Sequence, residues 1–163
     1  MRLSDYIIEW LSSKGIHDIF TVSGGGSIVL CDSVAKSDLV NYFCCHHEQA
    51  VAFAAEGYAR HSNKIGSAIV TTGPGGTNSL TGVSGAWIDS IPLLVISGQV
   101  KTQDINFDKK LRQKGPQEID IVSMVKGITK YSKTILNTNK IVKELNKIIN
   151  LATTGRPGPC LID

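Results

Sequence analysis

Apolar side chains follow two different spacings along the chain, and each spacing predicts one kind of element. Leu3, Ile7, Trp10 and Leu11 recur every three or four positions, which predicts a first helix that ends before Gly15. Elsewhere the apolar residues form short continuous runs, which are typical of buried strands. These runs predict strands over 18–22, 40–45, 67–72, 92–98 and 131–135, and a last strand that begins within the closing GRPGPCLID.

Helical patterns lie between the predicted strands. We expect a helix that carries Glu48, a turn at 73–76, a polar loop at about 101–117, and further helices over 28–36, 77–89, 118–127 and 138–152. Short apolar strands that alternate with helices are typical of βαβ units. The sequence therefore predicts an α/β fold, in which a parallel sheet of about six strands is covered by helices on both faces as a flavodoxin-like three-layer sandwich.

Length and composition predict one domain over residues 1–163, because a chain of 163 residues can bury one sizeable core but not two ordinary ones. No apolar run approaches the roughly 20 residues that span a bilayer. The N-terminus lacks the pattern of a secretory signal, so we expect a cytoplasmic protein without a membrane partner. The net charge of +3 comes largely from lysine-rich patches at 109–114 and 140–147, which are typical of solvated faces; no nucleic-acid recognition motif accompanies them.

Cysteine and histidine do not predict a metal site. The four cysteines form no CxxC pair, which favours reduced, buried thiols. His46 and His47 are adjacent, so on a helix their side chains diverge by about 100°. The H-E-x-x-H zinc pattern also fails, because position 51 is valine.

Three loops follow predicted strands: SGGGS at 23–27, HHEQ at 46–49 and TTGPGG at 71–76. Ligands of open α/β sheets bind outside the carboxyl ends of the strands, so these loops share one candidate edge. Glycine permits close backbone approach, and either glycine loop could cradle a phosphate or make an ordinary tight turn. Neither loop has the dinucleotide or P-loop fingerprint.

Glu48 is a carboxylate between an apolar run and an alanine-rich helix. On a helix starting near His47 it shares one face with small or apolar residues, namely Val51, Ala52, Ala55 and Ala59. One interpretation is a first-turn acid that complements the helix dipole, and spacing alone favours it. The other is an acid in an apolar crevice, with a raised pKa suited to exchanging a proton with a ligand. On the opposite side, Glu56 and Arg60 are expected to form an i,i+4 pair on a wetter surface.

Two long runs, HHEQAVAFAAEGYAR and TTGPGGTNSLTGVSGAWIDSIPLLVISGQV, occur in order and at the expected distance. Together they resemble the N-terminal pyrimidine-binding domain of thiamine diphosphate enzymes of the acetolactate synthase and pyruvate oxidase type. The resemblance begins with the first helix and VSGGGS, and it continues through PQEIDIVSMVKGITKYS to LATTGRPGPCLID. It therefore covers essentially the whole chain.

The resemblance implies a role for Glu48. The family's glutamate at this position hydrogen-bonds N1′ of the cofactor's aminopyrimidine and promotes the imino tautomer that removes the C2 proton of the thiazolium. The substrate implied is a 2-oxo acid, which is decarboxylated before its acyl carbanion is transferred to an acceptor. The remaining implied site residues are Thr71, Pro74 and Asn78 in the aminopyrimidine pocket, Val22, Ser23 and Gly25 in the first loop, and Gln117 near the reacting centre.

Three positions depart from the family pattern. Members commonly have proline at Ser23, arginine at His46 and phenylalanine at Pro116. The phenylalanine lies near the substrate in the family, so its replacement weakens the case for acetolactate formation from two pyruvates. Another 2-oxo acid decarboxylase or carboligase, a nucleotide-binding α/β module and a scaffold without activity stay open as alternatives.

The family's other parts are implied but are not found in these 163 residues. The diphosphate is held through Mg²⁺ by a separate domain marked by Gly-Asp-Gly, which does not occur here. A middle domain, with FAD in some members, follows the pyrimidine-binding domain. The resemblance therefore implies a homodimer or tetramer in which this chain alone is inactive, and the small residues Gly82, Ser84, Gly85 and Ala86 would suit either a subunit interface or packing within the domain.

Overall fold

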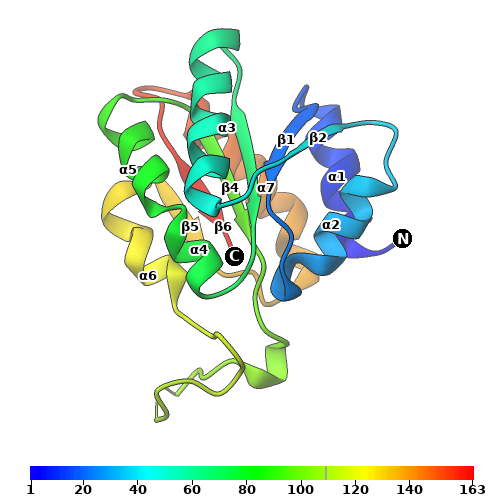
Figure 1. Cartoon of the computed structure of the whole chain (residues 1–163), viewed down its shortest axis with the longest axis vertical. Helices are drawn as coiled ribbons and strands as arrows, with labels where there is room; N and C mark the ends of the chain where they lie inside the picture. The colour runs from blue at the N-terminus through cyan, green and yellow to red at the C-terminus, as the bar shows by residue number, and fades with distance from the viewer. Residues whose placement is uncertain (109) are drawn as a thin grey trace.

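Six parallel strands form one sheet in the computed structural model, which describes residues 1–108 and 110–163 (Figure 1). Each strand pairs in parallel with its neighbours, in the order β2-β1-β3-β4-β6-β5. The strands are β1 Asp18–Thr21, β2 Asn41–Cys44, β3 Gly66–Val70, β4 Leu93–Ser97, β5 Tyr131–Lys133 and β6 Cys160–Ile162. The predicted parallel sheet of six strands is confirmed.

Helices cover both faces of this sheet. They are α1 Leu3–Ser13, α2 Ile28–Ala35, α3 Glu48–Ser62, α4 Pro74–Asn78, α5 Leu80–Ile88, α6 Ile121–Val125 and α7 Ile141–Thr153. Short 3₁₀ turns lie at η1 Gly25–Ser27, η2 Thr102–Asp104, η3 Lys126–Ile128 and η4 Thr138–Lys140. Figure 1 looks onto the face that α3 covers, with α1 and α2 to one side and α7 behind. The described residues thus form the expected three-layer α/β sandwich.

Two hydrophobic cores lie on the two faces of the sheet. Along β3, Ile69 packs with α1 and α7, whereas Ala68 and Val70 pack with α3 and α5. All five residues of β3 are buried, as are all five of β4. A central strand of a parallel sheet meets helices on both faces, which is why its sequence is a continuous apolar run rather than an alternating one.

Two predicted helices have different bounds in the structure. The segment predicted as a turn at 73–76 and a helix at 77–89 instead forms α4 and α5, which meet at Ser79; its Oγ donates to the carbonyl oxygen of Gly76 at 2.7 Å. Pro74 is the first residue of α4, a position where its missing N–H costs nothing. The helix predicted from 118 begins only at α6, because the Asp120 carboxylate accepts from the Ser123 backbone N–H at 3.0 Å.

Glu56 is buried, so its predicted place on a wetter surface is wrong. Helix α5 packs across this side of α3, and a Cβ added to Gly85 would lie 3.6 Å from both Glu56 carboxylate oxygens. The predicted pair with Arg60 is present at 2.6 Å. A Cβ on Gly82 would come within 2.5 Å of the Ala52 Cβ. The small residues of α5 therefore allow close packing within the chain, while their role between subunits stays a prediction.

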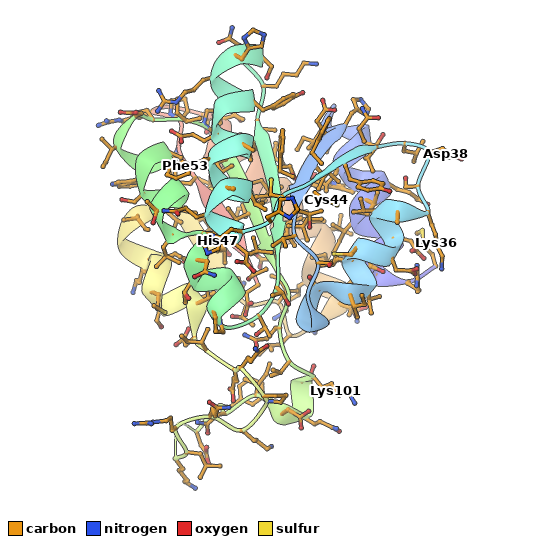
Figure 2. The ribbon with its side chains drawn as sticks, in the orientation of Figure 1. Lys36, Asp38, Cys44, His47, Phe53 and Lys101 are labelled. Carbon is orange, nitrogen blue, oxygen red and sulfur yellow. The ribbon has the colours of Figure 1, made fainter. Side chains whose placement is uncertain are left out.

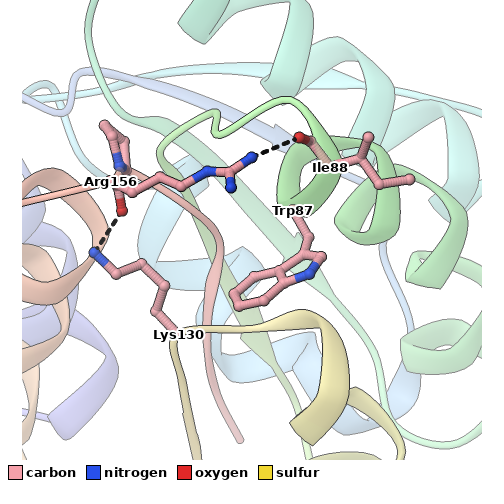
Figure 3. Close-up of a pocket in the computed structure, with 5 residues that line it drawn as sticks. Trp87, Ile88, Lys130 and Arg156 are labelled. Atoms are coloured by element: carbon pink, nitrogen blue, oxygen red, sulfur yellow. Dashed lines mark hydrogen bonds between the residues drawn. The ribbon is translucent and has the colours of Figure 1, made fainter.

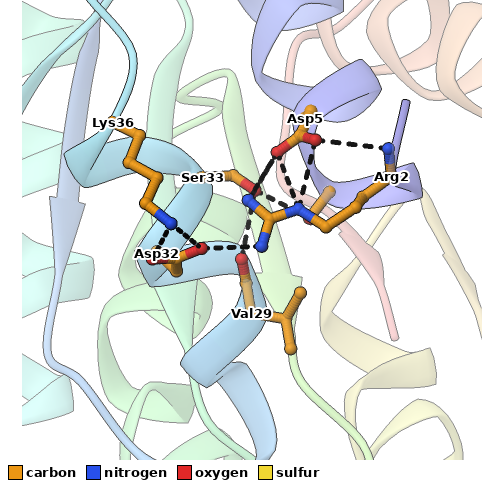
Figure 4. Close-up of polar contacts among 7 residues, drawn as sticks. Arg2, Asp5, Val29, Asp32, Ser33 and Lys36 are labelled. Carbon is orange, nitrogen blue, oxygen red and sulfur yellow. Dashed lines mark hydrogen bonds and ion pairs between the residues drawn. The ribbon is translucent and has the colours of Figure 1, made fainter.

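An ion-pair network joins α1 to α2 (Figure 4). The Arg2 guanidinium lies 2.8 Å from the Asp5 carboxylate and 2.7 Å from that of Asp32, which also pairs with Lys36 at 2.9 Å. The Ser33 hydroxyl donates to Asp5 at 2.7 Å. The hydrogen bond from Arg2 holds the pKa of Asp5 well below its usual range. This network fastens α2, the helix that follows the first glycine loop.

The four cysteines are free thiols, as predicted, but they are not all buried. Cys160 is buried in β6, whereas Cys44 is exposed because β2 is an edge strand whose four residues are all exposed. Figure 2 shows Cys44 and His47 along the segment that enters α3. The prediction of buried thiols is therefore confirmed only for Cys160, since Cys31 and Cys45 are half-buried and Cys44 is exposed.

The lysine-rich patches lie at the surface as far as the structure describes them. Lys110, Arg112 and Lys114 are exposed, and Lys109 of the same patch lies outside the described residues. On α7, Lys143 and Lys147 are also exposed. In the described part of the chain, no helix is both long and apolar enough to cross a bilayer.

Candidate functional site

Backbone segments meet closely at the carboxyl edge of the sheet. A Cβ on Gly24, in the loop after β1, would lie 2.5 Å from the Thr71 side chain in the loop after β3. A Cβ on Gly98, after β4, would lie 2.2 Å from the carbonyl oxygen of Gly26. Because real Cβ atoms do not approach so closely, glycine at these positions allows the loops to pack side by side.

Thr71, the first residue of the TTGPGG loop, contacts the SGGGS loop. Its Oγ1 accepts a hydrogen bond of 3.0 Å from the Gly26 backbone N–H. Its Cγ2 would lie 2.3 Å from a Cβ on Gly75. Thr71, predicted from the family resemblance to line a pocket, thus connects the first loop to the start of α4.

Glu48 is the first residue of α3, directly after the N-cap residue His47. The His47 Nδ1 accepts from the Gln49 backbone N–H at 3.2 Å, so this histidine caps the helix. Oε2 of Glu48 accepts a hydrogen bond of 2.9 Å from the Asn78 side-chain amide. Among the described residues no group donates to Oε1 of Glu48, which leaves this oxygen available to a ligand.

Glu48 has small, buried side chains on its own helix face and is itself partly exposed to solvent. The helix face that it shares with Val51, Ala52, Ala55 and Ala59 is buried, as the spacing predicted. A Cβ on Gly75 would lie 3.0 Å from Oε1 and 2.3 Å from Cγ2 of Thr71, so only glycine allows the α4 backbone to pack this closely against Glu48 and Thr71. Glu48 itself is half-buried. The carboxylate therefore lies at the margin of the core, within reach of a flat group brought in from outside.

A cleft of about 350 Å³ lies along the same edge of the sheet. Its lining includes Gly25 and Gln117, two of the predicted site residues, and also Pro116. The loop before α6 crosses the edge here, and the Gln117 carbonyl oxygen would lie 2.1 Å from a Cβ on Gly73. Both Gly73 and Gln117 have φ of 61°, so two left-handed residues meet at this contact.

The remaining predicted residues are Val22, Pro74 and Ser23, which make no described hydrogen bond with Glu48, Asn78 or Thr71. Val22 is half-buried and packs on the core that faces α3. Pro74 is exposed at the start of α4, where its carbonyl oxygen accepts from Thr77 Oγ1 at 3.1 Å. Ser23 is exposed. In the structure, Asn78 is hydrogen-bonded to Glu48, and Gly75 packs between Glu48 and Thr71. Gly25 and Gln117 line one cleft.

Gln99 is a residue of this edge that sequence analysis did not identify. Its Oε1 accepts from Thr72 Oγ1 at 3.0 Å, and its Nε2 donates to the Asp163 carboxylate at 3.0 Å. Asp163 also accepts from Ser97 at 2.8 Å and from Thr134 at 3.0 Å, while burial raises its pKa. Gln99 and Asp163 are 64 positions apart, so no local pattern reveals the pair.

A second hollow, of about 270 Å³, lies at the amino edge of the sheet (Figure 3). Trp87 and Ile88 at the end of α5 face Lys130 and Arg156 across it. The Lys130 ammonium donates to the Arg156 carbonyl oxygen at 2.8 Å, and the Arg156 guanidinium donates to that of Ile88 at 3.3 Å. These contacts fasten the turn before β6 to α5. None of the predicted site residues lines this hollow.

Residues 1–124 match the family described as "Thiamine pyrophosphate enzyme, N-terminal TPP binding domain". The chain belongs to this family. The matched region includes Gln117 and the contacts of Glu48 with Asn78 and Gly75 described above. The family resemblance expected from the sequence is confirmed.

Curated relatives within this thiamine pyrophosphate enzyme family are acetolactate synthases. The chain is 38% identical over 160 residues to the probable acetolactate synthase 2, chloroplastic, of Oryza sativa subsp. japonica, covering 98% of the chain and 23% of that protein. It is 39% identical over 160 residues to the acetolactate synthase large subunits of Buchnera aphidicola subsp. Schizaphis graminum and of Lactococcus lactis subsp. lactis, covering 98% of the chain and 27% of each protein. The chain thus spans about a quarter of the length of the curated relatives it matches.

The residues present fit the pyrimidine part of thiamine diphosphate. One carboxylate oxygen of Glu48 is held by Asn78, and no described residue donates a hydrogen bond to the other, which lies next to Gly75. No group of three or more histidine, cysteine or acidic side chains among residues 1–108 and 110–163 could hold a metal ion. A carboxylate oxygen without a protein donor is suited to a hydrogen bond with a ring nitrogen.

Proposed function

We propose that this chain binds the aminopyrimidine of thiamine diphosphate in an enzyme that decarboxylates a 2-oxo acid and transfers the acyl carbanion to an acceptor. The observation that carries the proposal is the carboxylate of Glu48 at a helix N-terminus, with Oε2 bonded to Asn78 and no described residue donating a hydrogen bond to Oε1. The family match and the names of the curated relatives support it.

Glu48 is proposed to exchange a proton with a nitrogen of the bound ring, acting as a general acid and base. Asn78 holds the carboxylate in one orientation, and the glycines around Thr71 hold the loops of this edge close together. When bound, thiamine diphosphate supplies an acidic carbon that adds to a carbonyl and a cationic ring that accepts negative charge. The protein then contributes orientation and the exclusion of water.

Gln117 and Pro116 are proposed to face the substrate from the loop before α6, since both line the 350 Å³ cleft with Gly25. Proline presents a small, rigid ring where the family commonly has phenylalanine. This difference favours an acceptor other than a second pyruvate, so a decarboxylase or another carboligase is the second form of the same proposal.

The rest of the proposed enzyme lies outside these residues. We propose that the diphosphate and its Mg²⁺ are bound by another domain, that the enzyme is a homodimer or tetramer in the cytoplasm, and that FAD is a further cofactor to test for. The isolated chain is expected to be inactive, because the diphosphate of the cofactor is proposed to bind to that other domain. No nucleic acid or membrane partner is proposed.

Glu48→Gln in the full-length protein tests the proposal. We expect thiamine diphosphate-dependent release of CO₂ from pyruvate and 2-oxobutanoate to fall by at least about 100-fold, in the range of lost acid–base catalysis. Glu9→Gln, on the exposed face of α1, is the matched control and keeps normal turnover. Near-normal turnover in Glu48→Gln contradicts the proposal, whereas tight nucleotide binding without thiamine diphosphate binding favours the nucleotide-binding alternative.

A further inference from the structure

Glu118 organises the loop that crosses the carboxyl edge of the sheet before α6. Its carboxylate accepts three backbone N–H groups: Asn106 at 2.5 Å, Lys114 at 2.7 Å and Gly115 at 3.2 Å. Partial burial raises the pKa of Glu118, but these three hydrogen bonds outweigh it and bring the pKa below its usual value. One ionised side chain thus gathers two segments that are eight or nine positions apart.

The backbone before and after Glu118 contacts the segment that follows β4. A Cβ on Gly115 would lie 2.9 Å from the Val100 side chain, in the segment after β4. The carbonyl oxygen of Ile119 accepts from Gln99 Nε2 at 3.3 Å. Glu118 therefore lies between two points at which the loop is attached to the body of the protein.

Gln117, the residue before Glu118, has a backbone that needs such support. Its φ of 61° is uncommon for a residue with a side chain and strains the backbone. A conformation of this kind persists where the surroundings impose it. Here its carbonyl oxygen packs against Gly73, and its side chain is exposed at the cleft that Gly25 also lines.

We propose that Glu118 is a positioning residue, which holds Gln117 in its left-handed conformation at the cleft by fixing the loop segments that precede Gln117. The role of Gln117 toward substrate rests on the proposed function. The fixing of the loop by Glu118 does not, because it follows from the three hydrogen bonds alone.

Amide hydrogen exchange on the chain tests the fixing of the loop. In Glu118→Gln, the side-chain NH₂ group would meet backbone N–H donors, so exchange at Lys114 and Gly115 is expected to become at least about tenfold faster. Glu118→Asp keeps the charge but shortens the reach, and an intermediate rate is expected. Asp108→Asn is the matched control, since this carboxylate is exposed on the same loop. Unchanged exchange in Glu118→Gln overturns the proposal.

Turnover of the full-length protein tests the link to Gln117. Glu118→Gln is expected to lower kcat about tenfold with little change in KM when Gln117 is present, but less than about twofold in the Gln117→Ala background. Equal losses in both backgrounds would overturn the positioning role and leave Glu118 a structural residue. If the unaltered protein has no thiamine diphosphate-dependent turnover, the proposed function fails, and the exchange measurement still decides whether Glu118 fixes the loop.

Discussion

The side-chain amide of Asn78 donates a hydrogen bond of 2.9 Å to Oε2 of Glu48, from a helix 30 positions further along the chain. The bond joins the end of α4 to the first turn of α3 and fixes which carboxylate oxygen is occupied. Oε1 lies next to Gly75 and accepts no hydrogen bond from a described residue. The role proposed for Glu48 needs a fixed orientation of the carboxylate, which the hydrogen bond from Asn78 favours.

Asn78→Ala is expected to weaken thiamine diphosphate binding by the full-length protein about tenfold, because one neutral-to-charged hydrogen bond is lost. Titration of the apoprotein with the cofactor, followed by tryptophan fluorescence, measures the change. Asn139→Ala, in the exposed turn before α7, is the control and should bind normally. Unaltered affinity in Asn78→Ala contradicts an orienting role for the amide.

Gly82→Ala is expected to lower the free energy of unfolding by roughly 1–3 kcal/mol, because the new Cβ would lie 2.5 Å from that of Ala52 in a packed core. Gly57→Ala provides the matched contrast. A Cβ on Gly57 meets nothing within 4 Å on the surface of α3, and alanine there is expected to stabilise the helix by up to about 1 kcal/mol. Urea unfolding of the two variants gives both signs in one experiment. Equal effects would mean that α3 and α5 are less closely packed than described.

Glu144→Gln is expected to reduce stability at neutral pH by roughly 1 kcal/mol, because a buried carboxylate loses its charge toward Lys133 and Tyr131. The hydrogen bond from Lys133, followed by that from Tyr131, lowers the pKa of Glu144 below its ordinary 4.5. An acid whose pKa falls on folding stabilises the protein above its unfolded pKa, and this contribution is lost as the pH falls through the folded value.

The free energies of unfolding of Glu144→Gln and of the unaltered chain should therefore differ at pH 7. They should converge as the pH falls from 4.5 through the lower pKa that Glu144 has in the folded protein. Glu9→Gln, at an exposed position of α1, should follow the unaltered chain throughout. A constant difference between Glu144→Gln and the unaltered chain over the whole pH range would contradict the assignment.

Alkylation of the native chain by iodoacetamide should modify Cys44 first and Cys160 last, with rates that differ more than about tenfold near pH 8. Cys44 is exposed on the edge strand, whereas burial raises the pKa of the Cys160 thiol to about 11. Peptide mass mapping over time measures the order. In denaturant both cysteines should react alike, and early modification of native Cys160 would contradict its burial.

The fold could be predicted because its signals are local. Residues close together in the sequence form the apolar runs of β3 and β4, and all residues of these two strands are buried. The same holds for the face of α3 that Glu48 shares with Val51 and Ala55, which are both buried. Where elements differ, a single side chain decides. Ser79 ends α4 through a hydrogen bond to Gly76, and Asp120 delays the start of α6, whereas helical spacing continues through both positions.

The site could be predicted only through the family resemblance, since spacing alone favoured a dipole-complementing role for Glu48. The contacts that distinguish Glu48 from an ordinary first-turn acid, from Asn78 and beside Gly75, are made between separate elements. The prediction that Glu56 lies on a wetter surface was wrong for the same reason. Its side of α3 is covered by α5, and the sequence of α3 alone does not show which helix packs against that side.

The close approach of glycines at the carboxyl edge has a consequence for engineering. Side chains at positions 24 and 98 would collide with Thr71 or with backbone, so these positions cannot be used to reshape the cleft. Substitutions are better placed at Lys101, Asp104 and Pro116, which line the cleft from the segment between β4 and α6. A mutant library that aims to change which ligand the cleft binds should therefore randomise these positions and leave the glycines unaltered.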